Sequence, residues 1–345
     1  MRKMFVSAYE CKPGMRIAED IYNEYGAIII AENMILDDYI IMRIQEMGFT
    51  RVKIYETSEE MVPVGKTELF KAQYNENVDN FKGILHDISE GKDIDSKRVN
   101  EATNSIILRI NENRDIVNAV NEMRNSDEYL YSHSINVSLL SMLIGKWLKL
   151  DYKSIKSLVT SAYLHDIGMV KVPAEIVNKP TSLTAEEYDE VKMHCQYGFK
   201  TAETMQDMND DILKGILMHH EREDGSGYPF GLNSKQIHDN AKIIAVADIY
   251  DAMTSKRVYR RRICHFDVIE CIQRDYFRKL DQHIAGIFLN NIASYYIGEF
   301  VKLNTGAIGE IVHINQNNIS KPIIRSNDVY IDLSKERSIS IVELV

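Results

Sequence analysis

Histidines gather in one part of this chain, together with aspartates that could act beside them. Ten histidines occur in 345 residues, and five of them fall between positions 133 and 220: His133, His165, His194, His219 and His220. A lone histidine on an apolar helix face is usually a satisfied core residue, but five in one segment favour a metal site. Mixed imidazole and carboxylate ligands suit Fe, Mn, Zn or Co better than Ca or Mg.

Two pairs of candidate ligands are adjacent in the sequence, His165-Asp166 and His219-His220. Successive residues of a helix point about 100° apart, since the repeat is about 3.6 residues per turn. Adjacent ligands therefore chelate a single ion poorly. The pairs predict two ions side by side, with a carboxylate such as Asp166 bridging them and Asp248 supplying a further oxygen.

A pair of ions roughly 3.5–4 Å apart is a common device for displacement at phosphorus. Such ions lower the pKa of a bridging water, orient the resulting hydroxide and neutralise charge on the phosphoryl oxygens. The sequence therefore predicts a metal-dependent phosphohydrolase in which a metal-bridging hydroxide attacks phosphorus, with catalytic roles for Asp166, His165 and Asp248.

Helical periodicity accounts for the elements that would hold these residues. His133, Val137, Leu140 and Ile144 share one helix face at spacings of four, three and four. Asp248 follows Ile244 by one turn. We expect residues 126–298 to form an all-α domain that carries the site.

The flanking segments have different patterns. Residues 1–62 combine short apolar runs, turns and one helical repeat, which predicts a small α+β module, and residues 63–125 predict a helical connector. Residues 299–345 contain β-rich runs separated by Gly, Asn and Ser, which predicts a small β unit. These runs are 301–303, 308–314, 329–333 and 339–345. The fold class expected is mainly α, with small modules at both ends.

Composition excludes several classes of protein. The net charge of −10 leaves no basic excess for a nucleic-acid polymer. The four cysteines are scattered without a CxxC pair, which is typical of free thiols in a reducing compartment. No segment approaches the roughly 20 apolar residues that span a bilayer. We therefore expect a cytoplasmic protein without membrane insertion.

Three motifs resemble those of a known family. The segment HDIG at 165–168 resembles the HDxG signature of the HD superfamily of phosphohydrolases. The segment HHEREDGSGYP at 219–229 matches the HHExxDGxGYP motif of the HD-GYP subfamily, and residues 248–260 resemble its D-x-x-D-A-M-T-S-x-R-x-Y-R segment. The resemblance covers roughly residues 126–298 and implies an HD-type helical domain.

This resemblance implies a cyclic di-GMP phosphodiesterase that forms pGpG and, in some members, GMP. It also implies Fe or Mn as cofactor and a metal shell of seven residues. These are His133, His165, Asp166, His194, His219, His220 and Asp248. Some members hold a third metal with a Glu one turn before the first histidine; Tyr129 occupies that position here, which favours two metals.

Substrate contacts are expected from the GYP loop and from two arginines. Gly225 and Gly227 allow close backbone approach to a ligand, and Tyr228 could stack on the substrate or bond to it. Arg257 and Arg260 would supply forked phosphate contacts. A solvated charged face is the alternative interpretation of these arginines.

One departure from the family pattern keeps a second function open. Met169 follows HDxG where the family normally has Lys, and Met offers neither charge nor a hydrogen-bond donor. The alternative to an active enzyme is therefore a degenerate sensor that binds cyclic di-GMP with weak or no turnover. Hydrolysis of another cyclic dinucleotide or of a phosphomonoester is a third hypothesis. Oligomeric state stays open, although the helical stretch 66–125 could mediate a homodimer.

Overall fold

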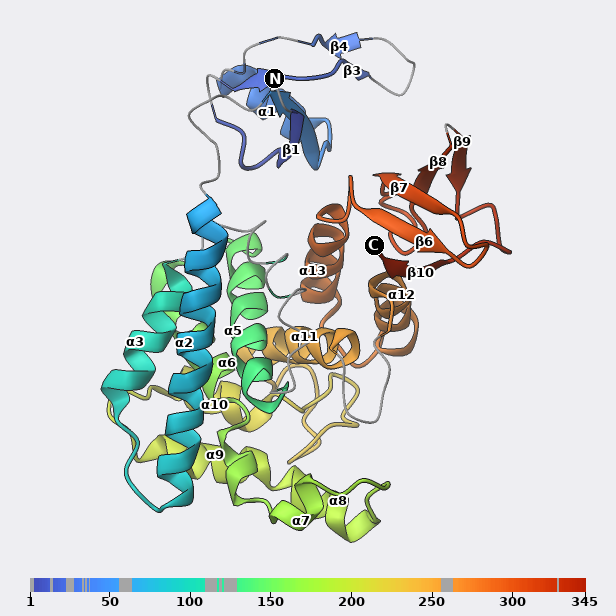
Figure 1. Ribbon diagram of the computed structural model, residues 1–345. Helices are drawn as coiled ribbons and strands as arrows, with labels where there is room; N and C mark the ends of the chain where they lie inside the picture. The colour runs from blue at the N-terminus through green and yellow to red at the C-terminus, as the bar shows by residue number, and fades with distance from the viewer. Residues whose placement is uncertain are drawn as a thin grey trace.

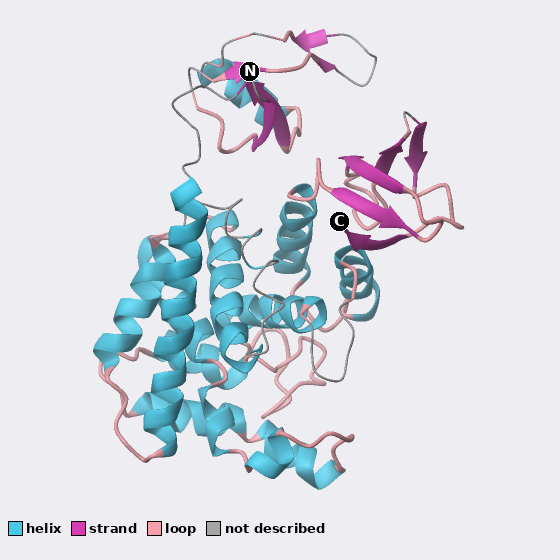
Figure 2. Ribbon diagram, viewed as in Figure 1, coloured by secondary structure: helices cyan, strands magenta, loops and turns pink. Residues whose placement is uncertain are grey.

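The protein consists of a helical body and small sheets that are formed by the N-terminal and C-terminal segments of the chain (Figures 1 and 2). The computed structural model describes residues 3–12, 15–22, 28–32, 34, 36, 38–55, 64–108, 117, 120, 129–255, 263–327 and 329–345. This architecture confirms the predicted fold class: mainly α, with a small α+β module first and a small β unit last. Within the described residues, no helix combines the length and apolar character needed to cross a membrane.

The N-terminal module has its own hydrophobic cluster, which includes Ile17, Leu36, Ile44 and Ile54. Its strands form a three-stranded antiparallel sheet of order β1-β5-β2 and a separate β3–β4 pair. The elements are β1 (Lys3–Ser7), β2 (Arg16–Ile17), β3 (Ile21–Tyr22), β4 (Ile28–Ile30), α1 (Asp38–Glu46) and β5 (Arg51–Tyr55). Gly48 follows α1 with φ +77°, a conformation that favours glycine and ends the helix.

The predicted connector contains two long helices, α2 (Val64–Ser89) and α3 (Ser96–Ile107). Asp95 caps α3 by accepting a hydrogen bond from the Lys97 backbone N–H. Phe81, Ile84 and Ile106 are almost fully buried and belong to the same core as the following helices. The boundary at residue 126 stays a prediction, but the hydrophobic core is continuous across it.

The helices of the body surround α11, a largely buried helix. Polar residues begin several of them: Asp151 caps α6, Asn209 caps α10, and Thr184 forms a capping box with Glu187 at α8. The elements are α5 (Tyr129–Trp147), α6 (Tyr152–Leu164), the 3-10 helix η1 (Ile167–Lys171), α7 (Ala174–Val177), α8 (Ala185–Lys192), α9 (His194–Glu203), α10 (Asp210–Met218), α11 (Asp239–Thr254), α12 (His265–Asp275) and α13 (Gln282–Ser294).

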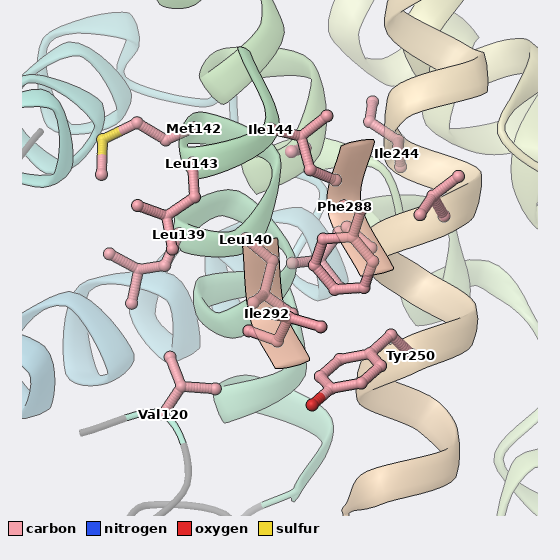
Figure 3. Packing of buried hydrophobic residues seen from close by; sticks show 14 of the residues in the cluster. Val120, Leu139, Leu140, Met142, Leu143, Ile144, Ile244, Tyr250, Phe288 and Ile292 are labelled. Atoms are coloured by element: carbon pink, nitrogen blue, oxygen red, sulfur yellow. The ribbon is translucent and has the colours of Figure 1, made fainter. Parts of the chain in front are cut away.

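Apolar side chains of α5, α11 and α13 interlock at the centre of this body (Figure 3). Leu140 and Ile144 of α5 lie near Phe288 of α13, and the Phe288 ring meets Tyr250 of α11 edge-on at 4.9 Å. Each such buried side chain contributes about 1.5–3 kcal/mol. This packing fixes α5 against α11, the two helices that carry His133 and Asp248.

The C-terminal unit is a five-stranded antiparallel sheet of order β10-β6-β7-β8-β9. Its strands are β6 (Phe300–Leu303), β7 (Ile308–His313), β8 (Ile323–Ser326), β9 (Val329–Asp332) and β10 (Ile341–Leu344). The sequence predicted runs that match β6, β7, β9 and β10 but did not predict β8. That strand pairs with β7 and β9 and is therefore internal to the sheet.

Candidate metal centre

The seven predicted ligands come from separate elements, and most of them lie at helix ends. His133 is in α5 and Asp248 in α11, whereas His165 and His219 are the residues that follow α6 and α10. His194 is the first residue of α9. The structure brings all of these side chains, with Asp166 and His220, into one buried cluster.

Asp166 lies at the middle of the cluster and faces a different set of histidines with each oxygen. Its Oδ1 is 3.4 Å from His194 Nε2 and 3.8 Å from His219 Nε2. Its Oδ2 is 3.3 Å from His165 Nε2 and 3.9 Å from His133 Nε2. A carboxylate placed in this way can bridge two ions.

Two groups of possible ligands share Asp166. One is Asp166 with His194, His219 and His220, the other is Asp166 with His133 and His165, and within each group the ligand atoms lie within 4.8 Å of one another. The sequence predicted different ions for His219 and His220. In the structure both fall in one group of possible ligands, with their rings 4.1 Å apart, centroid to centroid.

Asp248 lies between the two groups. Its Oδ1 is 3.1 Å from His133 Nε2 and its Oδ2 is 3.9 Å from His220 Nδ1. Asp248 can therefore contribute an oxygen beside either group.

Three histidines are oriented by backbone carbonyl groups of the helices that precede them, α6, α8 and α10. The Nδ1 of His165, His194 and His219 lies 2.6–2.7 Å from the carbonyl oxygen three residues earlier, in Ala162, Val191 and Ile216. A carbonyl oxygen only accepts, so each Nδ1 carries the proton and donates it. The lone pair is left on Nε2, which points into the cluster in each case.

His133 is oriented instead by a buried carboxylate that the sequence analysis did not single out. Asp251 Oδ2 lies 2.8 Å from His133 Nδ1, and Asp251 Oδ1 accepts from the Asn136 amide at 3.1 Å. This carboxylate–histidine arrangement is typical of metal ligands, because it fixes the ring and raises its basicity. The available signal was the position of Asp251, three residues after Asp248 on the same helix.

The chemistry of the cluster fits divalent cations. Burial and the neighbouring His220 hold the pKa of His219 far below its usual value, and burial lowers the pKa of His220 to about 3. Burial opposes ionisation of Asp248, but His133 and His220 outweigh it and keep the pKa of that carboxyl low. The neutral imidazoles of His219 and His220 are therefore electron-pair donors beside the ionised Asp248. At His165, burial opposes protonation, but Asp166 outweighs it and raises the pKa of that ring.

A further sign of cation binding is the Nε2 atom of His165. It is buried and has no hydrogen-bond partner among the described residues, although Asp166 Oδ2 lies 3.3 Å away. A buried polar nitrogen without a partner is costly unless a ligand satisfies it. A metal ion coordinated by His165 and Asp166 would do so.

The GYP loop folds back onto the two adjacent histidines. The buried Glu221 carboxylate accepts hydrogen bonds from the backbone N–H groups of Phe230 and Leu232, at 2.7 and 2.8 Å. The Tyr228 ring lies 4.7 Å from the His220 ring, centroid to centroid. Glu221 thus closes the loop, and Tyr228 covers a candidate ligand.

The two glycines of this loop have roles within the fold. Gly225 has φ +77°, and a side chain at Gly227 would collide with the backbone of residues 220–222. Contact of Gly225, Gly227 and Tyr228 with a substrate stays a prediction. Arg257 and Arg260 lie outside the described residues, as does the side chain of Tyr129 on which the predicted number of metals rests.

A cavity of about 450 Å³ opens beside Asp166. Met169 lines it together with residues of α2, whereas Lys171 is exposed on η1 and does not line it. The volume falls in the range of about 300–1,000 Å³ that is usual for small-molecule sites. The position that the family normally fills with Lys therefore faces this cavity.

The fold and the cluster together define a helical protein with a candidate dinuclear metal centre. Residues 116–284 match the family described as HD domain. The chain belongs to the HD family and, by its HHExxDGxGYP motif, to the HD-GYP branch.

Similar proteins include several named phosphodiesterases. The chain is 30% identical over 244 residues to the cyclic di-GMP phosphodiesterase PA4108 of Pseudomonas aeruginosa. This alignment covers 70% of this chain and 58% of that protein. It is 32% identical over 219 residues to the cyclic di-GMP phosphodiesterase PdeB of Borreliella burgdorferi, with coverage of 62% and 57%. The chain thus spans less than three fifths of these relatives.

Two further comparisons concern substrate and fold. The 3'3'-cGAMP-specific phosphodiesterase 1 of Vibrio cholerae is 31% identical over 170 residues, 49% of this chain and 39% of that protein. Among solved structures, the HDG"Y"P protein Bd1817 from Bdellovibrio bacteriovorus aligns with a TM-score of 0.53 over 83% of this chain and 98% of that chain. At 15% identity, this likeness concerns the fold alone.

Proposed function

We propose that the chain is a divalent-metal-dependent phosphodiesterase that hydrolyses cyclic di-GMP to pGpG. The observation that carries this proposal is the position of Asp166, whose two oxygens face two separate sets of histidines. The names of the relatives PA4108 and PdeB support the substrate.

The metals would be Fe or Mn, held in two positions that share Asp166. His194, His219 and His220 would complete one position and His133 and His165 the other, with Asp248 beside His133. When bound, such ions supply an activated water and neutralise charge on the phosphoryl oxygens.

The chain's own residues prepare the site for this chemistry. Hydrogen bonds to helix carbonyls and to Asp251 fix the imidazole rings before any ligand arrives, so little reorganisation is needed. The cavity beside Asp166 offers room for a nucleotide, and the Tyr228 ring covers His220 on another side of the cluster. The site is therefore suited to hold a phosphodiester against the cluster.

The direct test is turnover by protein loaded anaerobically with Fe or Mn. We expect conversion of cyclic di-GMP to pGpG by the wild type, and its loss in Asp166→Ala because the bridging ligand is gone. Asp189→Ala removes an exposed acid that pairs with Lys192 on α8 and serves as the matched control. Equal activity in Asp166→Ala and the wild type would contradict the proposal.

Two alternatives are distinguished by the same assay. A relative named for 3'3'-cGAMP favours trying that dinucleotide beside cyclic di-GMP, and a higher kcat/KM for it would reassign the substrate. Met169 in the cavity favours the sensor alternative. Tight cyclic di-GMP binding without turnover, in protein with two metals per chain, would establish the sensor.

A further inference from the structure

The cavity beside Asp166 has one wall made by α2, a helix that precedes the part of the chain matched by the HD family. α2 runs alongside α5 (Figure 1) and contributes Lys82 and Leu85 to the lining, opposite Met169 and Val170. The metal cluster and α2 therefore border the same space.

Few side chains of the described lining can carry a charge near neutral pH. They are Lys82, His86 and Asp166, of which Asp166 is the candidate bridging ligand. Lys82 Nζ lies 5.4 Å from the centre of the Tyr131 ring and 3.3 Å from Asp79 Oδ1. Tyr131 and Asp166 line the same cavity as Lys82, so this contact keeps the ammonium beside the space that the cluster borders.

α2 is also linked to the cluster by hydrogen bonds. The buried Tyr74 hydroxyl donates to Asn136 Oδ1 at 2.8 Å, and the Asn136 amide donates to Asp251, the carboxylate that orients His133. Lys82 lies eight residues after Tyr74, about 12 Å along the helix. The position of Lys82 relative to the metal ligands is thus fixed by the structure of α2.

We propose that Lys82 binds a phosphate of the substrate and takes the place of the lysine that Met169 replaces. The inference rests on the proposed phosphodiesterase function. A dinucleotide bound at the metals presents a second phosphate and apolar base faces to the rest of the cavity. Lys82 offers the ammonium for the phosphate, and Leu85 and Val170 offer apolar contact for a base.

Lys82 is a suitable residue to test because its removal costs the fold little. Its side chain is partly exposed, and its ion pair with Asp79 lies at the surface, where such pairs contribute little to stability. Lys97 is the control: it lies on α3, forms a surface ion pair with Glu101 at 3.8 Å, and does not line this cavity.

The experiment compares the Mn-loaded wild type with Lys82→Met, Lys97→Met and the double variant Lys82→Met/Met169→Lys. Two quantities are measured: kcat/KM for cyclic di-GMP, and the calorimetric affinity for pGpG, which needs no turnover. We expect Lys82→Met to lower both about tenfold to a hundredfold, the range for one charged hydrogen bond. The Lys97→Met variant should match the wild type, and Met169→Lys should restore at least half of the loss on a logarithmic scale.

The outcomes separate this inference from the proposed function. If Lys82→Met retains wild-type kcat/KM and pGpG affinity, Lys82 does not bind substrate. If the wild type binds the nucleotides but does not hydrolyse cyclic di-GMP, the phosphodiesterase proposal fails, and the affinities alone decide the role of Lys82. A wild type that neither binds nor hydrolyses them overturns both.

Discussion

Asp251 shows how a residue outside the metal shell can control it. One oxygen faces His133, while the other accepts from Asn136 and lies 3.3 Å from the Ser255 hydroxyl. Three donors converge on two oxygens in a place without access to water, since Asp251 is fully buried. Each carboxylate oxygen therefore accepts at least one hydrogen bond from a protein donor.

We predict that Asp251→Asn lowers metal affinity about tenfold to a hundredfold, the range for such supporting partners. An amide replaces one acceptor by a donor, so either His133 or Asn136 loses its bond. Metal content after dialysis against graded free Mn measures the effect. Ser255→Ala keeps the carboxylate and should bind like the wild type; equal affinity in Asp251→Asn would refute the orienting role.

Metal removal gives a second prediction at this scale. A ligand that binds only the folded state stabilises it, by about 2.7 kcal/mol at a hundred times its Kd. We expect chelation to lower the Tm of the wild type and to leave the Tm of Asp166→Ala unchanged. If the Tm of the wild type changes with neither chelator nor added Mn, the result would contradict a metal centre.

The sequence predicted the residues of the cluster better than their pairing. Residue type and motif sufficed to select His165 and His219, which the fold does bring together. The sharing of one group by His219 and His220 could not be predicted, because it depends on how the two imidazole rings are oriented. Asp251 was missed because its partner His133 lies 118 positions away in the chain.

Among the elements, the contact between η1 and α9 depends on Gly168. A Cβ at this position would collide with the carbonyl oxygen of His194 and with the backbone of Gly198. The first residue of α9 is itself a candidate ligand, so this close approach brings His194 to Asp166. Gly168 therefore serves the site through helix packing.

We predict that Gly168→Ala destabilises the fold by about 1–3 kcal/mol, the usual cost of overpacking, and lowers metal affinity as α9 shifts. Gly286→Ala is the control: Gly286 lies within α13, and a Cβ there meets nothing within 4 Å. That variant should be as stable as the wild type or more so, by up to about 1 kcal/mol. Chemical denaturation and Mn titration check both; a neutral Gly168→Ala would refute the packing argument.

Strand β8 shows where prediction of elements fails. Its four residues, Ile323–Ser326, follow Pro322 and include only two apolar side chains, so the local pattern is too short to indicate a strand. The pairing with β7 and β9 supplies what the local sequence lacks. Long helices such as α5 and α11 were predictable because their repeats extend over several turns.

At the scale of the whole molecule, Arg51 joins the N-terminal module to the helical body. It lies in β5, yet its Nη1 donates to the carbonyl oxygens of Ser294, the last residue of α13, and of Ile297, at 2.6 and 3.1 Å. Its guanidinium lies 5.1 Å from the centre of the Tyr295 ring. No sequence pattern indicates this contact, because its partners are 243 or more positions apart.

The position of Arg51 explains why a cation is suited to this junction. The last carbonyl groups of a helix lack partners within it and carry partial negative charge. Arg51 is only 8% exposed, so the two carbonyl oxygens it serves are shielded from water. Without the guanidinium, both oxygens would lose this donor, and Ser294 would keep, among the described residues, only the Ile297 N–H at 3.3 Å. Water could replace the guanidinium only if the module moved away from α13.

We therefore predict that Arg51→Met loosens the N-terminal module while the helical body keeps its fold. Amide hydrogen exchange should speed up in β1, β5 and the 294–298 segment, but not in α6 or α11. Lys53→Met, two residues further along β5, removes a partly exposed cation that pairs with Glu19 and lies 4.9 Å from the centre of the Phe5 ring, and it should leave exchange unchanged. If Arg51→Met protects these segments as well as the wild type does, apolar contacts such as that of Phe5 near Gly298 hold the module without the arginine.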